Sequence, residues 1–209
     1  MMQRPGGAEF APNAFVYPGG SVHGEDGLYP DQHRAAAVRE LFEEVGILMA
    51  RRPDGLFARD RECSQIRVQL AAGVPFPAAL EAGGLSPAFD RLALLTRWIT
   101  PAALKRRFDT HFYMARLPPG QTVHPQAGEV VGWRWVVPAA AVVDEALVMV
   151  PATRQILQSI AAEPDPSRLI SRLRRRLPPE PVQPVLIADG GRFRIEIPAP
   201  RRPKRPVRT

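Results

Sequence analysis

The sequence predicts an α/β (α+β) domain that combines one amphipathic helix with several short strands. The chain has 209 residues, 45% of them apolar, which suits one domain with appendages. Residues 32–45 carry apolar side chains at helical spacing. Residues 92–100, 108–116 and 130–137 are instead rich in β-branched and aromatic side chains, which is typical of strands.

The amino-terminal part predicts a strand, a turn, a polar loop and then the helix. Residues 14–17 form a short apolar strand that enters the Pro-Gly-Gly turn at 18–20. After a polar loop, Asp31 stands where the helix needs an N-cap acceptor for its first backbone N–H groups. Gly46 follows where a C-terminal cap belongs, so the helix is expected over residues 32–45.

Two short helices are predicted next, as a helical insertion at about residues 50–87. The runs 92–100 and 108–116 are expected to be adjacent strands. The run 130–137 predicts a further strand, whose residues Val131, Trp133 and Trp135 share one face. Helices are expected to begin at two later prolines, Pro138 and Pro151.

The carboxyl-terminal part is basic. Residues 168–209 hold 12 of the 28 basic residues but 3 of the 21 acidic ones. We expect an Arg-rich helix and a β-hairpin over residues 166–198, with the hairpin turn at 189–191, and a disordered basic tail over 199–209. The arginines at 172–176 and in the tail could contact nucleic-acid phosphates, but no aromatic residues are interleaved to read bases, so a solubilising role is favoured.

Several function classes are excluded by composition and motifs. The single cysteine, Cys63, excludes an intrachain disulfide and sites of clustered cysteines, and it is interpreted as a small buried apolar residue. The P-loop, HExxH and G-x-S-x-G motifs are absent. The sequence contains neither a membrane-spanning apolar stretch nor a signal peptide, and a cytoplasmic location is expected.

Three glutamates near the end of the predicted helix indicate a metal site. Glu40, Glu43 and Glu44 stand at i, i+3 and i+4, which places their carboxylates on one side of the helix. Like charges at this spacing, at the negative end of the helix dipole, are locally unfavourable. A hard divalent cation would favour the arrangement, because carboxylate oxygens are the ligands that Mg²⁺ takes.

The segment that carries these glutamates resembles the Nudix box. It reads RELFEEVGI over residues 39–47 and fits the core of the box, REUxEExGU, in which U is an aliphatic residue. The resemblance implies a Nudix-type α/β/α sandwich with a mixed β-sheet and metal-dependent hydrolysis of a diphosphate linkage. The loop before the helix departs from the family pattern. Ten residues instead of five separate Gly20 from Asp31, which is expected to replace the glutamate of the box.

One branch of this family, the acyl-coenzyme A diphosphatase-like Nudix proteins with a lengthened box, is similar in further segments. These are RWITP at 97–101, RRFDT at 106–110 and the helical insertion, so the resemblance covers residues 1–165, which we take as the Nudix domain. The residues Met1–Arg4 resemble the end of a strand whose beginning is missing, which predicts a start of the natural chain further upstream. The implied substrate is coenzyme A or acyl-coenzyme A; the alternatives are ADP-ribose-like or other nucleotides, or a catalytically weak nucleic-acid-binding module.

The resemblance also implies roles for individual residues. Glu40 and Glu44 would bind Mg²⁺ or Mn²⁺, Glu43 would join them or act in proton transfer, and the Gly19 carbonyl would add a ligand. Arg39 would orient a glutamate, and Glu129, ahead of a Trp-containing strand, would supply a further acid. The predicted substrate contacts are two arginines that could hold a second phosphate and an aspartate on the next strand: Arg106, Arg107 and Asp109.

Overall fold

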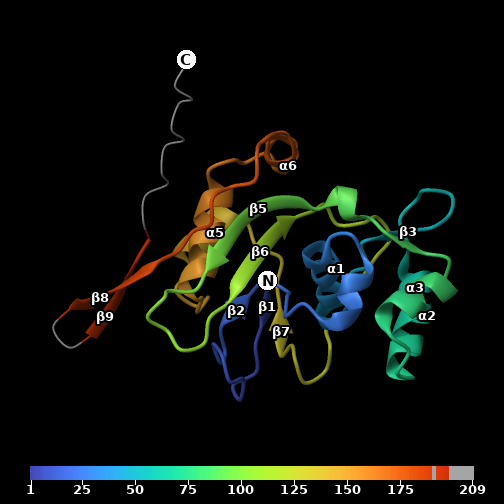
Figure 1. Cartoon of the computed structure of the whole chain (residues 1–209), viewed down its shortest axis with the longest axis horizontal. Helices are drawn as coiled ribbons and strands as arrows, with labels where there is room; N and C mark the ends of the chain where they lie inside the picture. Colours follow the sequence, from blue (N-terminus) through green and yellow to red (C-terminus); the bar gives the residue numbers. More distant parts are fainter. Residues whose placement is uncertain (190–191, 198–209) are drawn as a thin grey trace. The chain divides into compact units, whose positions relative to one another are not determined.

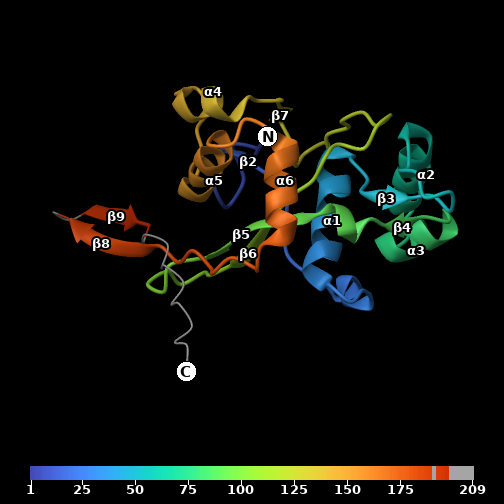
Figure 2. The same ribbon diagram turned by 90° about the horizontal axis from the view of Figure 1, so that it is seen from above.

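The computed structural model describes residues 1–189 and 192–197 and is shown from two directions in Figures 1 and 2. It divides into two compact units, one of residues 1–92 and 115–170 and the other of residues 93–114 and the described residues from Ser171 onward. The predicted basic tail at 199–209 and two residues of the predicted hairpin turn, 190 and 191, lie outside the described residues. None of the helices in the described ranges is long and apolar enough to cross a membrane.

The larger sheet of the first unit consists of three short strands. Strand β1 (Met2–Gln3) lies between β2 (Phe15–Val16) and β7 (Gly132–Trp133), and both pairings are antiparallel. The predicted strand over 130–137 is shorter than expected, because β1, its partner in this sheet, is two residues long. Parallel pairing within the described residues is limited to two isolated bridges, Phe15 with Met149 and Trp98 with Val182.

Helices cover both faces of this sheet. Met2 packs on one face against Val45 and Ile47, at the end of helix α1 (Gln32–Val45). Phe15 points to the opposite face, where it packs against residues of α4 (Pro138–Val143) and α5 (Pro151–Ala161). Figure 2 shows the resulting order of layers in this unit, with α4 and α5 on one side of the strands and α1 on the other.

Helix α1 begins and ends where the sequence predicts. The Asp31 side chain accepts a hydrogen bond from the Arg34 backbone N–H at 3.1 Å. Gly46 adopts φ 75° and donates its N–H to the Phe42 carbonyl at 2.8 Å. The loop before α1 contains an unpredicted 3₁₀ helix, η1 (Gly24–Leu28), whose sequence GEDGL has no apolar period to reveal it.

The two predicted helices between residues 50 and 87 are confirmed as α2 (Asp60–Ala71) and α3 (Phe76–Ala82). Strand β3 (Ala50–Arg51) pairs antiparallel with β4 (Ser86–Pro87), so the two ends of the segment lie side by side. A second short 3₁₀ helix, η2 (Phe89–Arg91), follows. Cys63 is fully buried, and burial raises the pKa of its thiol to about 11, in keeping with the predicted apolar role.

The second unit contains two antiparallel hairpins. Strand β5 (Ala93–Ile99) pairs with β6 (Asp109–Met114), as predicted, with a register shift between Leu94 and Thr96. Strand β8 (Val185–Asp189) pairs with β9 (Arg192–Glu196). The predicted Arg-rich helix is α6 (Pro166–Arg175), whose residues belong partly to each unit.

Candidate active site

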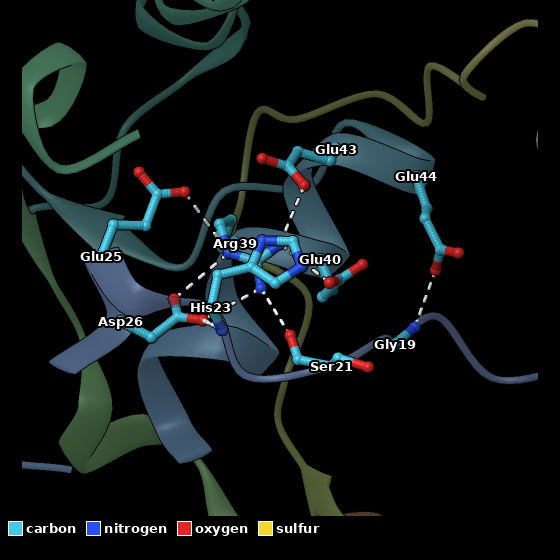
Figure 3. Close-up of polar contacts among 9 residues, drawn as sticks. All are labelled: Gly19, Ser21, His23, Glu25, Asp26, Arg39, Glu40, Glu43 and Glu44. Atoms are coloured by element: carbon cyan, nitrogen blue, oxygen red, sulfur yellow. Dashed lines mark hydrogen bonds and ion pairs between the residues drawn. The ribbon is translucent and has the colours of Figure 1, made fainter. Parts of the chain in front are cut away.

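Two of the predicted acidic residues of α1, Glu40 and Glu43, contact the guanidinium of Arg39 together with Asp26, as Figure 3 shows. The Arg39 side chain is fully buried, and five hydrogen bonds use the five N–H groups that a guanidinium has. Burial alone would lower the pKa of Arg39, but the hydrogen bonds to Asp26 and Glu40 outweigh burial and raise the pKa above its usual value. Arg39 is therefore a permanent buried cation that holds several acceptors in place.

The buried partner of Arg39 is Asp26 from η1. Arg39 Nε donates to Asp26 Oδ1 at 3.2 Å and Nη2 donates to Oδ2 at 3.0 Å. Asp26 Oδ2 also accepts the backbone N–H of His23 at 2.8 Å, which ties the carboxylate to the start of η1. This bidentate pair fixes the loop before α1 against the middle of the helix.

The expectation that Asp31 replaces the acid of the box is wrong. Asp31 is half-exposed, caps α1 and contacts Arg34, whereas Asp26 takes the position beside Arg39. A signal for Asp26 is present in the sequence, because five residues separate it from Gly20, which is the spacing of the box. The five extra residues of the loop therefore follow the acid instead of preceding it.

Two glutamates share the remaining side of the guanidinium. Arg39 Nη1 donates to Glu40 Oε1 at 2.8 Å and to Glu43 Oε2 at 3.0 Å, and Nη2 donates to the Ser21 carbonyl at 2.8 Å. Burial raises the pKa of Glu43 although its contact with Arg39 acts in the opposite direction. The two ion pairs direct both carboxylates toward Arg39.

Glu44 is the most buried of the three glutamates on this helix, with 7% of its surface exposed. Its Oε2 accepts the backbone N–H of Gly19 at 2.7 Å. Burial raises the pKa of Glu44 to about 7; the Gly19 N–H opposes this shift, and the neighbouring carboxylates of Glu40 and Glu129 add to it. A carboxylate that is both desolvated and close to other carboxylates is poorly stabilised until a cation comes near.

The loop that carries Glu129 is attached to the end of α1. The backbone N–H groups of His124 and Gln126 donate to the carbonyls of Val45 and Glu44, each at 2.9 Å. Glu129 follows in a turn closed by its own N–H and the Gln126 carbonyl at 3.3 Å, and its side chain is exposed. The Glu129 carboxylate is one of the groups that raise the pKa of Glu44.

The residues of this site have the chemistry of a divalent-cation site. Carboxylate and carbonyl oxygens are hard donors, and a cation would offset the repulsion among the carboxylates of Glu40, Glu44 and Glu129. Within residues 1–189 and 192–197, no three histidine, cysteine, aspartate or glutamate side chains already converge on one point as metal ligands. Glu40 and Glu43 are directed to Arg39 instead, and Glu44 to Gly19 (Figure 3).

The three predicted substrate contacts lie in the second unit, with Arg106 and Arg107 in the turn between β5 and β6 and Asp109 at the start of β6. Arg97 binds both carboxylate oxygens of Asp109, with Nε at 2.7 Å from Oδ1. The Arg106 guanidinium lies over the Phe108 ring, with its Cζ 5.3 Å from the ring centroid. Arg107 Nε donates to the Thr100 carbonyl at 3.3 Å. The pair of Asp109 with Arg97 was not foreseen, because neighbouring strands bring together residues distant in sequence.

Known proteins of similar sequence include one from Caenorhabditis elegans and one from Homo sapiens. No protein-family model matches the chain. The protein named Putative nudix hydrolase 7, from Caenorhabditis elegans, is 32% identical over 146 residues, which cover 70% of this chain and 48% of the relative. The protein named Acyl-coenzyme A diphosphatase NUDT19, from Homo sapiens, is 32% identical over 130 residues, with 52% of this chain and 32% of the relative covered. The chain thus spans about half of the first relative and about a third of the second.

A solved structure shares the fold. The crystal structure of a NUDIX hydrolase from Alicyclobacillus acidocaldarius aligns with a TM-score of 0.67 and 21% sequence identity, over 81% of this chain and 86% of that chain. The predicted fold, helices on both sides of a small sheet, is thereby confirmed.

Proposed function

We propose that the chain is a member of the Nudix hydrolase superfamily and that it hydrolyses the diphosphate linkage between a nucleoside diphosphate and another moiety, with coenzyme A or acyl-coenzyme A as its substrate. The observation that carries this proposal is the buried Arg39, which arranges acidic side chains from the loop and from α1 around one guanidinium. A structural ion pair needs only one acid. Arg39 instead binds several carboxylates, which lie close together although they repel one another.

The cation in this proposal is Mg²⁺ or Mn²⁺. Glu40, Glu43, Glu44 and the Gly19 carbonyl would hold it, and it would acidify bound water and neutralise charge on the phosphate oxygens. Glu44 fits this role because burial has already removed most of the water that would otherwise stabilise its charge.

The other residues position groups and move protons. Arg39 keeps Glu40 and Glu43 directed to one side of the helix. The Glu129 carboxylate, exposed and near Glu44, would accept a proton from the attacking water, and Glu43 is the alternative acceptor. Arg106 and Arg107 would bind the second phosphate, with Asp109 beside them on β6.

The choice of coenzyme A rests on the similarity to the human protein, supported by the two segments around β5 and β6 and by the helices α2 and α3. ADP-ribose-like compounds and other nucleotides are the alternative substrates for the same chemistry. A cytoplasmic location suits such substrates.

The test is Mg²⁺-dependent hydrolysis of a panel of coenzyme A, acyl-coenzyme A, ADP-ribose, dinucleotides and nucleoside triphosphates, with products identified by mass. We expect adenosine 3′,5′-bisphosphate and phosphopantetheine from coenzyme A. The variant Glu44→Gln should lose roughly a hundredfold or more of kcat, because one charged oxygen donor is removed. Glu145→Gln changes an exposed glutamate outside the site and should retain full activity.

Each outcome of this panel has a definite meaning. Cleavage of another member of the panel would keep the reaction and replace the substrate. If the folded protein cleaves nothing with Mg²⁺ or Mn²⁺ but binds nucleic acid through its arginines, the proposal is wrong and the chain is a binding module.

A further inference from the structure

Gly20 leaves a space that the Glu40 carboxylate fills. A Cβ atom added to Gly20 would lie 2.4 Å from Glu40 Oε1, 2.5 Å from Cδ and 2.6 Å from Oε2. Such distances are far below a van der Waals contact between carbon and these atoms. Therefore no other residue can stand at this position while Glu40 keeps its place.

The backbone conformation is not what requires glycine here. Gly19, the preceding residue, and Gly46 have positive φ values, whereas Gly20 does not. An alanine could adopt the Gly20 backbone without conformational strain. The requirement is consequently for room beside Glu40.

A Cβ atom at Gly20 meets the flexible end of the Glu40 side chain, so Glu40 would move first, and this movement would break a contact within the site. Glu40 Oε1 accepts from Arg39 Nη1 at 2.8 Å, and Arg39 is fully buried and fixed by Asp26. The loop is held on both sides of Gly20: the Gly19 N–H donates to Glu44 at 2.7 Å and the Ser21 carbonyl accepts from Arg39 at 2.8 Å. Moving the loop would therefore break contacts of Glu44 or Arg39, and moving Glu40 would break its own pair with Arg39.

We infer that Gly20 is a positioning residue for Glu40, because the absence of a side chain keeps the Glu40 carboxylate beside Arg39 and next to the carboxylates that bind the cation. The inference rests on the proposed function for the role of Glu40 as a metal ligand. The steric coupling of Gly20 to Glu40 can be measured without it.

The first experiment is a double-mutant cycle on stability, which needs neither metal nor substrate. Tm is measured by thermal unfolding in the presence of a chelator for the wild type, Gly20→Ala, Glu40→Ala and the double variant. We expect Gly20→Ala to lower Tm in the wild-type background and to leave it unchanged or raised in the Glu40→Ala background, where the space is open. Equal shifts in the two backgrounds would overturn the inference.

The second experiment measures binding of Mn²⁺ alone by titration calorimetry. Gly20→Ala should weaken Mn²⁺ binding by about tenfold or more, because displacing a ligand's support has this effect at metal sites. Gly24→Ala is the matched control, since it adds the same methyl group to the same loop where nothing lies within 4 Å. Wild-type affinity in Gly20→Ala would contradict the inference.

The two experiments separate the inference from the proposed function. If the wild type binds no Mn²⁺ and cleaves no substrate, the proposed function fails and Gly20 has no metal ligand to position. A positive stability cycle would then show a steric role alone, and the inference as stated would be wrong.

Discussion

Arg39 and Asp26 show how a single buried pair can organise a whole site. All N–H groups of the guanidinium donate hydrogen bonds. Its planar shape allows three carboxylates and one backbone carbonyl to bind at once. A lysine could supply the charge but not the five donors in one plane. Because all of these groups bind the Arg39 side chain, the position of each one affects the positions of the others.

The first prediction concerns the acid that stabilises Arg39. Asp26→Ala should lower the free energy of unfolding by roughly 3 kcal/mol, because it leaves a buried charge without its bidentate partner. Asp31→Ala should cost only about 1 kcal/mol, since Asp31 is a half-exposed helix cap. Urea unfolding of the two variants measures the difference. A larger loss for Asp31→Ala would mean that the second aspartate takes the role of the first.

The second prediction concerns acid stability and Asp60. The Thr122 hydroxyl and the Thr122 backbone N–H donate to this carboxylate at 2.6 Å and 2.7 Å, and they hold its pKa below the usual 3.8. A lowered pKa stabilises the folded state at neutral pH, and this contribution is lost as the pH falls below about 4. Asp60→Asn should therefore destabilise the protein at neutral pH and less so in acid. Unfolding curves over a pH series check this, and a difference that grows in acid would contradict it.

At the scale of elements, the end of α1 is held by the chain that follows β6. The carbonyls of Glu44 and Val45 would lack partners at a free helix end, and the N–H groups of Gln126 and His124 supply them. Gly46 sits inside this junction: a Cβ there would lie 2.9 Å from His124 Cβ and 3.1 Å from the His124 carbonyl oxygen. The helix that carries Glu44 and the loop that carries Glu129 are thus joined through backbone atoms.

The third prediction tests this junction. Gly46→Ala should destabilise the protein by about 2 kcal/mol or more, because alanine is strained at φ 75° and also collides with His124. Gly73→Ala is the matched comparison, since Gly73 has φ 81° at the end of α2 but nothing within 4 Å. Gly73→Ala should lower the free energy of unfolding by about 1 kcal/mol, which is the cost of the backbone strain alone. Equal losses in thermal or urea unfolding would mean that the contact with His124 carries no cost.

Elements with local causes were predictable, and elements set by distant partners were not. Helix α1 follows from its apolar spacing and its two caps, which are all adjacent in sequence. The length of β7 depends on β1, more than a hundred residues away, so its composition predicted too long a strand. The 3₁₀ helix η1 contains Asp26, whose carboxylate binds Arg39 and the His23 backbone N–H. The contact with Arg39 joins residues far apart in the sequence, so local propensity does not predict it.

For the molecule as a whole, the sequence predicted the kind of fold and the position of three glutamates on one helix better than the contacts that these glutamates make. The spacing of Glu40, Glu43 and Glu44 follows from helix geometry alone. That Glu44 is buried while Glu129 is exposed depends on the packing of the loop after β6. The relation of Asp109 to Arg97 depends on the register of two strands, which no local pattern reveals.

The three tryptophans of the chain are divided unequally between the two units, so tryptophan fluorescence can follow the unfolding of one unit. Trp98, in β5 of the second unit, is 7% exposed, whereas Trp133 and Trp135, in the first unit, are 42% and 67% exposed. Because the exposed pair already contacts water in the folded state, we expect the shift in fluorescence on unfolding to arise chiefly from Trp98. Helices α1 to α5 lie in the first unit, so far-ultraviolet circular dichroism follows that unit instead. Whether the two signals change at one denaturant concentration therefore reveals whether the units unfold as one.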